Sequence, residues 1–403
     1  MASDGTGQAK CSRRLPVALL AVALGAFCAT AGALVGSRGA EQAQAQGQAQ
    51  EQEGDPAERP MAAAPPGAAL QTTKKAIWGL TKHNGDSLFP KYQDLGVGIF
   101  QTQARWDQIA QLGRPEKPTD PDDPTYLWPA YLEDAVSEAE SHGMEVMIQI
   151  IGAPRWANGG RDWIWAPTQP SDFADFATAI ARRFPSVNLW MIWGEPNRKP
   201  NFRPFTAARP YAKKLTKAQA RAPRTYSQLL DAAYDALKGV TVDNLVIGGN
   251  TYITGGRGTI RPYQWIRYMR LPDGSRPRMD MWGHNPYSYR KPNLKSRPSP
   301  RGRVDFSDLG RLAKALDRTF PGPPLRLFLS EFGVPTKWDM DFQFFVSPKT
   351  SVKWISAALR IVRNWDRIYT LGWSVPVDTH RNPQGLLDSA GNPKPGYAAF
   401  KAG

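Results

Sequence analysis

Two glutamates each follow a short apolar run, at the point where that run gives way to loop residues. Glu195 lies in Trp-Gly-Glu-Pro-Asn, residues 193–197, and Glu331 lies in Leu-Ser-Glu-Phe-Gly, residues 329–333. Cleavage of a glycosidic bond needs one protonated carboxyl, which donates to the leaving oxygen, and one ionised carboxyl, which attacks or activates water. A lone glutamate at a strand end is usually an ordinary surface residue. The elements that position these two therefore decide whether they can act as a pair.

Apolar runs and helix-length segments alternate along the chain from about residue 73. The expected strands are Ala76–Leu80, Val97–Gln103, Glu145–Ile151, Asn188–Gly194, Asn244–Asn250, Met279–His284, Leu325–Glu331 and Leu371–Val375. This alternation predicts an α/β fold, a (β/α)8 TIM barrel, whose active site lies at the C-terminal ends of the strands. An open doubly wound sheet is the alternative, but no Gly-rich phosphate loop follows the first strand.

The predicted barrel places both glutamates at its mouth. Glu331 shares the two-residue alternation of Leu325, Leu327 and Leu329, so we expect it to point inward. Glu195 is the first carboxylate after the fourth strand, which is apolar on both faces as a buried barrel strand must be. Amphipathic intervals supply helices to cover the barrel, as in the pattern of Tyr226, Leu229, Leu230, Ala233, Tyr234 and Leu237.

The first 72 residues do not have the composition of a folded core. Residues 1–39 combine a basic start with an apolar stretch, which predicts a signal peptide or a membrane anchor. Residues 40–72 are rich in Ala, Gln and Pro and read as a disordered linker before a catalytic domain at 73–403. Both cysteines, Cys11 and Cys28, precede the linker, so we expect no disulfide in the domain. We expect the protein to be secreted or held at the cell surface.

The residues around the two glutamates resemble those of the clan A glycoside hydrolases, which include cellulases, mannanases and β-xylosidases. The resemblance covers roughly residues 76–400 and includes the C-terminal Gly- and Pro-containing stretch 384–397. It implies that Glu195 is the acid/base and Glu331 the nucleophile of a retaining mechanism on β-linked oligo- or polysaccharides. We expect no metal and no other cofactor.

The chain also departs from the clan pattern. Gly194 stands where the clan has the Asn that bonds the sugar 2-hydroxyl, and Gln101, five residues before Trp106, stands where it has an Arg. His-Asn-Pro-Tyr, residues 284–287, resembles the clan's His-Pro-Tyr, so Tyr287 is expected to bond Glu331. Stacking of sugar rings on aromatic planes adds further candidates. The expected substrate-binding residues are Trp373, Tyr287, His284, Asn285, Trp156, Gln101, Trp106 and Asn197.

Charge leaves two other functions open. The net charge is +15, and basic residues crowd the loop after Glu195 and the stretch 290–303. The first alternative is a cell-surface carbohydrate-binding barrel with little or no turnover, which Gly194 and Gln101 favour. The second is a binder of anionic envelope polymers through these basic loops. A solvated basic surface without a ligand is the simpler explanation of the charge.

Other chemistries have little support in the sequence. The four histidines lack His-Glu-x-x-His spacing, which makes a catalytic zinc improbable, and no Gly-x-Ser-x-Gly elbow is present. No module with interleaved basic and aromatic residues predicts nucleic-acid binding. We expect a monomer acting on a carbohydrate.

Overall fold

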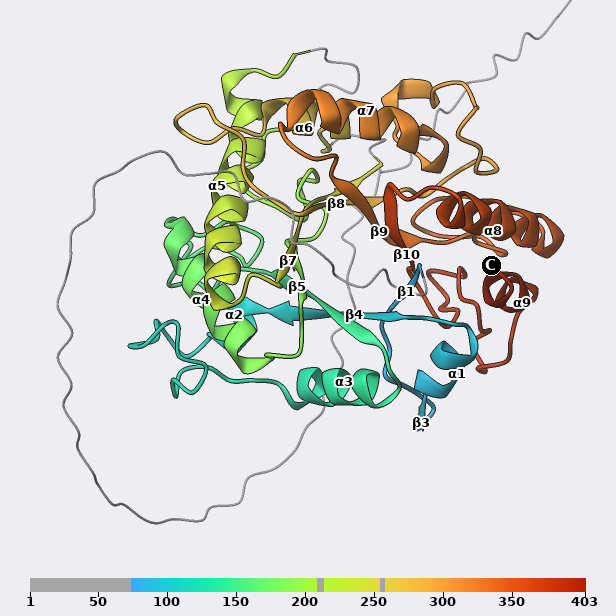
Figure 1. The fold of residues 1–403 in the computed structure, drawn as a ribbon, viewed down its shortest axis with the longest axis horizontal. Helices are drawn as coiled ribbons and strands as arrows, with labels where there is room; N and C mark the ends of the chain where they lie inside the picture. Colours follow the sequence, from blue (N-terminus) through green and yellow to red (C-terminus); the bar gives the residue numbers. More distant parts are fainter. Residues whose placement is uncertain (1–73, 209–213, 254–257) are drawn as a thin grey trace, which may run out of the picture. The chain divides into compact units, whose positions relative to one another are not determined.

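The computed structural model describes residues 74–208, 214–253 and 258–403. The expected signal or anchor at 1–39 and the linker at 40–72 lie outside these residues. The eight long strands of the described part form a closed parallel barrel in the order β1-β10-β9-β8-β7-β6-β5-β4 (Figure 1). This confirms the predicted (β/α)8 architecture and rules out the open doubly wound sheet.

Each of the eight predicted strands has a counterpart in the barrel. They are β1 (Lys75–Trp78), β4 (Ile99–Arg105), β5 (Glu145–Ile151), β6 (Leu189–Ile192), β7 (Leu245–Tyr252), β8 (Met281–Asn285), β9 (Arg326–Phe332) and β10 (Ile368–Trp373). The short strands β2 (Lys82–His83) and β3 (Asp86–Ser87) form a separate antiparallel pair.

Helices surround the strands, and α8 and α9 lie beside each other near the C-terminus (Figure 1). The helices are α1 (Phe89–Asp94), α2 (Trp106–Ile109), α3 (Ala130–Ser141), α4 (Pro170–Arg183), α5 (Lys217–Val240), α6 (Pro262–Tyr268), α7 (Leu309–Thr319), α8 (Pro348–Arg363) and α9 (Pro395–Lys401), with 3-10 turns η1 (Pro300–Gly302) and η2 (Phe306–Asp308). The apolar face predicted for α5 is buried, except for the half-buried Tyr234. Within the described ranges, no helix is long and apolar enough to cross a membrane.

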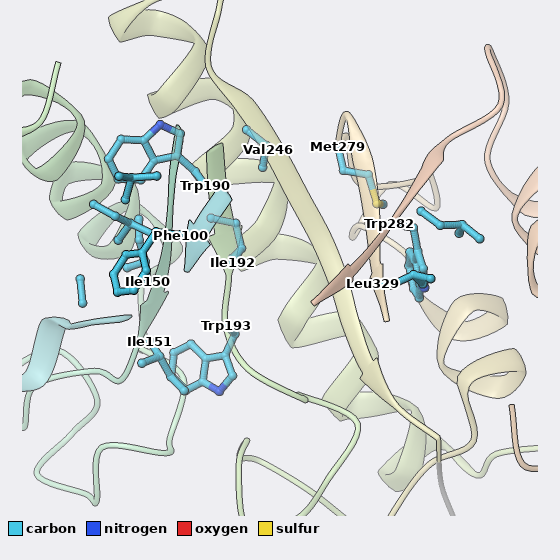
Figure 2. Packing of buried hydrophobic residues seen from close by; sticks show 14 of the residues in the cluster. Phe100, Ile150, Ile151, Trp190, Ile192, Trp193, Val246, Met279, Trp282 and Leu329 are labelled. Carbon is cyan, nitrogen blue, oxygen red and sulfur yellow. The ribbon is translucent and has the colours of Figure 1, made fainter. Parts of the chain in front are cut away.

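Side chains of the strands pack in two separate layers. Those that point outward, such as Trp190 and Ile192 of β6 and Leu329 of β9, meet the helices in the larger core (Figure 2). Those that point inward form a second cluster that fills the barrel: Ala76, Ile99, Met147, Leu189, Met191, Ile247, Met281 and Phe328. On β4 and β5, the residue two positions beyond the inward apolar one is polar, namely Gln101 and Gln149. The barrel interior is thus apolar toward the N-terminal ends of the strands and polar at the mouth, where the strands end.

Candidate active site

Glu195 is presented by a tight turn at the end of β6. Trp193 and Glu195 both have positive φ angles, 65° and 43°, a region that bulky residues seldom occupy. The indole Nε1 of Trp193 donates to the carbonyl oxygen of Asn201 at 2.7 Å, which holds the turn. Backbone strain of this kind concentrates at functional sites. The turn brings the Glu195 side chain to the barrel mouth, where the residue is 7% exposed.

Glu331 reaches the mouth for a different reason from the one expected. Leu327 and Leu329 belong to the outward core, and Phe328 to the inward cluster, so simple alternation would turn Glu331 outward. The register between β9 and β10 shifts between the pairs Leu371–Leu329 and Trp373–Phe332. This irregularity lets Ser330 and Glu331 both point inward. The predicted direction is therefore correct, but the argument from the leucines is wrong.

A hydrogen-bond network joins the two carboxylates. The amide Nδ2 of Asn285 donates to Glu195 Oε1 at 2.9 Å, and Arg198 forms an ion pair with Glu195 Oε2. The hydroxyl of Tyr287 donates to Glu331 Oε2 at 2.7 Å, which confirms the contact expected for this tyrosine. Glu195 follows β6 and Glu331 lies on β9, with β7 and β8 between them in the barrel, and the partners of both glutamates come from β8 and the loop after it.

The surroundings of Glu331 shift the pKa of its carboxyl group. Burial, and next the charge of Glu195, raise the pKa of Glu331 to about 8, while the hydroxyl of Tyr287, the charge of Arg198 and the amide of Asn285 act in the opposite direction. Glu331 is only partly exposed at the base of the mouth, so few waters can stabilise its charge. Glu331 therefore carries a proton near neutral pH, and it must lose that proton before it can attack an anomeric carbon.

Arg198, one of the basic residues in the loop after Glu195, lies at the candidate site. Its guanidinium lies 4.4 Å from the ring centroid of Tyr252, so an aromatic face and a carboxylate hold it in place. Its position three residues after Glu195, in a turn rather than a long helix, is the signal that could have identified it. Arg105, at the end of β4, has other partners: its Nε donates to Asp107 Oδ1 at 2.7 Å, and its guanidinium lies 4.0 Å from the ring centroid of Trp163.

The space left by Gly194 is filled from β5. A Cβ at position 194 would lie 3.1 Å from Oε1 and 3.2 Å from Nε2 of Gln149. Gln149 in turn accepts a 2.7 Å hydrogen bond from Gln103 Nε2. An amide therefore lines the mouth beside Glu195 even though position 194 supplies none. The inward alternation of β5, which carries Met147 and then Gln149, is the signal that could have predicted it.

Gln101 supports the strand that carries the nucleophile candidate. Its Nε2 donates to the carbonyl oxygen of Ser330 at 3.0 Å, directly before Glu331. A Cβ at Gly372 would lie 2.1 Å from that oxygen, so only glycine permits this approach. The Oε1 of Gln101 is buried without a hydrogen-bond partner among the described residues. Among the described residues, no hydrogen bond joins Gln101 to Glu331.

His284 and Asn197, which were expected to bind substrate, instead make hydrogen bonds within the protein. His284 has no exposed surface: its Nδ1 lies 2.9 Å from Thr251 Oγ1, and its Nε2 lies 2.9 Å from the carbonyl oxygen of Val304. Burial lowers its pKa to about 4, so the ring is neutral. Asn197 is equally buried and joins the turn after β6 to the end of β7, because its Oδ1 accepts from the Tyr252 backbone N–H at 2.9 Å. Neither side chain has a polar atom left for a sugar.

The structure also corrects the expected aromatic platforms. Trp373 is 1% exposed and packs edge to face against Phe332 and Phe400, so it offers no face to a sugar. Trp106 is fully buried. Trp156 is partly buried, and its Nε1 donates to the carbonyl oxygen of Ala110 at 2.9 Å. Residue type alone cannot distinguish an aromatic core from an aromatic platform.

Exposed aromatic residues occur elsewhere at the mouth. Trp338 and Phe345, in the loop between β9 and α8, are 58% and 54% exposed and lie edge to face with ring centroids 6.3 Å apart. The same loop carries Phe342, whose ring centroid is 4.5 Å from that of Tyr287. This loop directly follows the strand of Glu331 and is a rim on which sugar rings could stack. Within the described ranges, no group of three His, Cys, Asp or Glu side chains is arranged to hold a metal ion.

Comparison with known proteins finds solved structures with the same barrel fold. No protein-family model matches the sequence, and no curated protein matches it. Among solved structures, the chain is similar to a family 39 glycoside hydrolase from Bacteroides cellulosilyticus, with 18% identity, a TM-score of 0.57, and coverage of 82% of this chain and 62% of that one. The chain has the (β/α)8 fold of clan A glycoside hydrolases.

Two further structures agree with this fold. A glucosidase from Croceicoccus marinus has 15% identity and a TM-score of 0.57, with coverage of 81% of this chain and 64% of that chain. A monomeric β-xylosidase from Caulobacter crescentus has 16% identity and a TM-score of 0.53, with coverage of 81% and 67%. The chain thus spans roughly two thirds of the length of these similar proteins.

Proposed function

We propose that the protein is a retaining glycoside hydrolase that cleaves β-linked oligo- or polysaccharides. The observation that carries this proposal is the pair formed by Glu195 and Glu331, which share one hydrogen-bond network at the C-terminal mouth of the barrel. The fold shared with glycoside hydrolases and the exposed aromatic rim after β9 support it. The chemistry needs no cofactor.

The proposed reaction has two displacements. Glu331 attacks the anomeric carbon while Glu195 donates its proton to the leaving oxygen, which gives a covalent glycosyl ester. Glu195 then removes a proton from water, and that water attacks the anomeric carbon and releases Glu331. Because the proton rests on Glu331 below a pH of about 8 in the unliganded chain, the cycle begins with its transfer to Glu195. The hydrogen bond from Tyr287 stabilises the ionised nucleophile.

Azide rescue tests this assignment of roles. An aryl β-glycoside with a good leaving group needs little acid assistance, so Glu195→Ala should form the covalent ester and then give a β-glycosyl azide in the presence of azide. Glu331→Ala should instead give the α-glycosyl azide, because azide takes the place of the nucleophile. The opposite pairing of products and variants would reverse the two roles. Absence of azide adducts from both variants, with an active wild type, would contradict the double displacement.

A binding protein with little turnover is the second candidate. Arg198 neutralises Glu195, position 194 lacks an amide, and the raised pKa of Glu331 keeps it protonated near neutral pH. Such a site would hold a sugar chain without cleaving it. Saturable binding of an oligosaccharide with no release of reducing ends would favour this candidate over the hydrolase.

We also propose that the protein acts outside the cytoplasm as a monomer, since residues 1–39 have the composition of a signal or anchor. Fractionation of cells that express the full chain tests this proposal. Recovery from the medium with a shortened N-terminus would indicate a cleaved signal, and recovery from membranes would indicate an anchor. A full-length chain in the cytoplasm would contradict export.

A further inference from the structure

A basic pocket lies beside α6 and α7, and neither of the two glutamates lines it. It has a volume of about 360 Å³, at the lower end of the range of small-molecule sites. Its lining comes from α6, from the loop between β8 and α7, and from α7 itself: Tyr263, Pro298, Ser299, Gly302, Arg303, Asp308, Arg311, Lys314 and Arg318. We call it the α7 pocket. Four of these side chains are cationic and one is acidic.

The single acid of the α7 pocket is already neutralised. Asp308 lies 3.0 Å from Arg311 Nη1 and 3.2 Å from Arg290 Nη2, and it also accepts from the Ser299 backbone N–H at 3.1 Å. The pocket therefore retains an excess of positive charge. An anionic group that entered it would meet no unpaired carboxylate among the lining residues.

The cations of α7 are placed on one face of the helix. Arg311, Lys314 and Arg318 are separated by three and four residues, so their side chains are neighbours. Like charges at this spacing repel each other, so they do not stabilise α7 by themselves. Lys314 and Arg318 are exposed, and neither has an ion-pair partner in the part of the chain that the structure describes. Asp317, between them in sequence, pairs instead with Arg367.

The α7 pocket is linked to the candidate active site by one loop and a series of aromatic contacts. The guanidinium of Arg303 lies 4.6 Å from the ring centroid of Tyr289. The ring centroid of Tyr289 in turn lies 6.2 Å from that of Phe342. Phe342 contacts Tyr287 at 4.5 Å, and Tyr287 donates to Glu331. Tyr287 and Arg303 both belong to the loop between β8 and α7. An extended chain that leaves the mouth over this loop would pass beside the pocket.

We propose that the α7 pocket is a binding subsite for an anionic group of a glycan chain. The guanidinium groups of Arg303 and Arg318 can each form paired hydrogen bonds to a carboxylate or phosphate, and Lys314 adds a point charge. The carboxylate of a uronic-acid unit is the simplest occupant, since the volume is that of a small ligand. The inference rests on the proposed function only in taking the ligand to be a sugar chain.

The experiment compares two oligomers of identical linkage and length. One is a hexamer of β-1,4-linked glucuronic acid, and the other is cellohexaose, which lacks the carboxylates. Binding to the full chain is measured by calorimetry at moderate salt, for wild type, for Lys314→Gln/Arg318→Gln, and for the control Lys349→Gln/Lys353→Gln. The control pair is also exposed, also four residues apart, on α8, and its substitution removes the same two charges.

We expect wild type and control to bind the acidic hexamer more tightly than cellohexaose. The α7 variant should lose about tenfold or more in affinity for the acidic hexamer and none for cellohexaose, because it loses charge-assisted hydrogen bonds only to the anion. A glycerol phosphate oligomer that binds more tightly, with the same dependence on Lys314 and Arg318, would keep the subsite and identify phosphate as the anion.

Three results would overturn the inference. These are equal losses in the two double variants, which would reflect net charge alone; equal affinity of wild type for the two hexamers; and no measurable binding of either anionic oligomer. Hydrolysis is scored separately. Turnover of a neutral chain without a preference for anions would refute the subsite but support the proposed hydrolase activity. Specific anion binding without turnover of any chain would support the subsite but contradict the hydrolase activity.

Discussion

Replacement of Glu331 by Gln should stabilise the folded chain at alkaline pH and have little effect at acid pH. The folded chain holds a proton on Glu331 up to a pH of about 8, whereas the unfolded chain releases it near 4.5. Between these values the folded state binds more protons, so the free energy of unfolding falls as pH rises, by about 1.4 kcal/mol per pH unit. Gln has the shape of the protonated acid and no charge to bury.

The full interval would correspond to roughly 5 kcal/mol. Because Glu331 is partly exposed and part of its shift comes from the nearby charge of Glu195, we expect a smaller gain, about 2 kcal/mol at a pH of about 9 relative to about 5. Urea denaturation followed by tryptophan fluorescence measures the difference, with the exposed Glu140→Gln on α3 as control. Equal stability changes for Glu331→Gln at both pH values would refute the argument that burial and the charge of Glu195 hold the proton there.

Three further predictions concern neighbouring residues. Tyr287→Phe removes the donor 2.7 Å from Glu331 Oε2, so the pKa of Glu331 should rise. The acid limb of the kcat/KM profile should then move to higher pH, and rates should fall by about tenfold or more. A pH profile that does not move would count against a role for this hydrogen bond. Gly194→Ala places a Cβ 3.1 to 3.3 Å from the Gln149 amide, so the free energy of unfolding should fall by about 1 kcal/mol in thermal or urea denaturation. Gln149→Ala in the same chain should restore most of this loss. Additive losses would show that the two side chains do not compete for space. His284 has a pKa of about 4 in the folded chain and 6.5 in the unfolded chain, so the unfolded state binds more protons between these values. The free energy of unfolding should therefore fall as the pH drops from 6.5 to 4. NMR shifts of the imidazole nitrogens that report a protonated ring at a pH of about 6 in the folded chain would contradict this.

The barrel could be predicted because its physical cause is visible in the sequence. A strand buried on both faces must be a short apolar run, and β6 shows this at each position from Leu189 to Ile192. The glutamates could be predicted because each ends such a run. The contact of Tyr287 with Glu331 was expected only from the resemblance of residues 284–287 to the clan's His-Pro-Tyr, and the position of Tyr287 two residues after β8 is consistent with it.

The rest of the site depends on geometry that periodicity does not carry. Alternation gave the direction of Glu331 for the wrong reason, because the register shift between β9 and β10 is invisible in sequence. The burial of Trp373 depends on α9, which places Phe400 against it from a remote part of the chain. Arg198 was one basic residue among many until the turn at Glu195 brought the two side chains together.

The central claim is that Glu195 and Glu331 together cleave glycosidic bonds, and release of reducing ends tests it most directly. The assay compares wild type with Glu195→Ala and Glu331→Ala on β-glucans, xylans, mannans and acidic polysaccharides. We expect wild type to release reducing ends from at least one polymer, and both variants to lose activity by a factor of about 100 or more. Release that persists in either variant, or a wild type that binds a polymer and releases nothing, would contradict the claim.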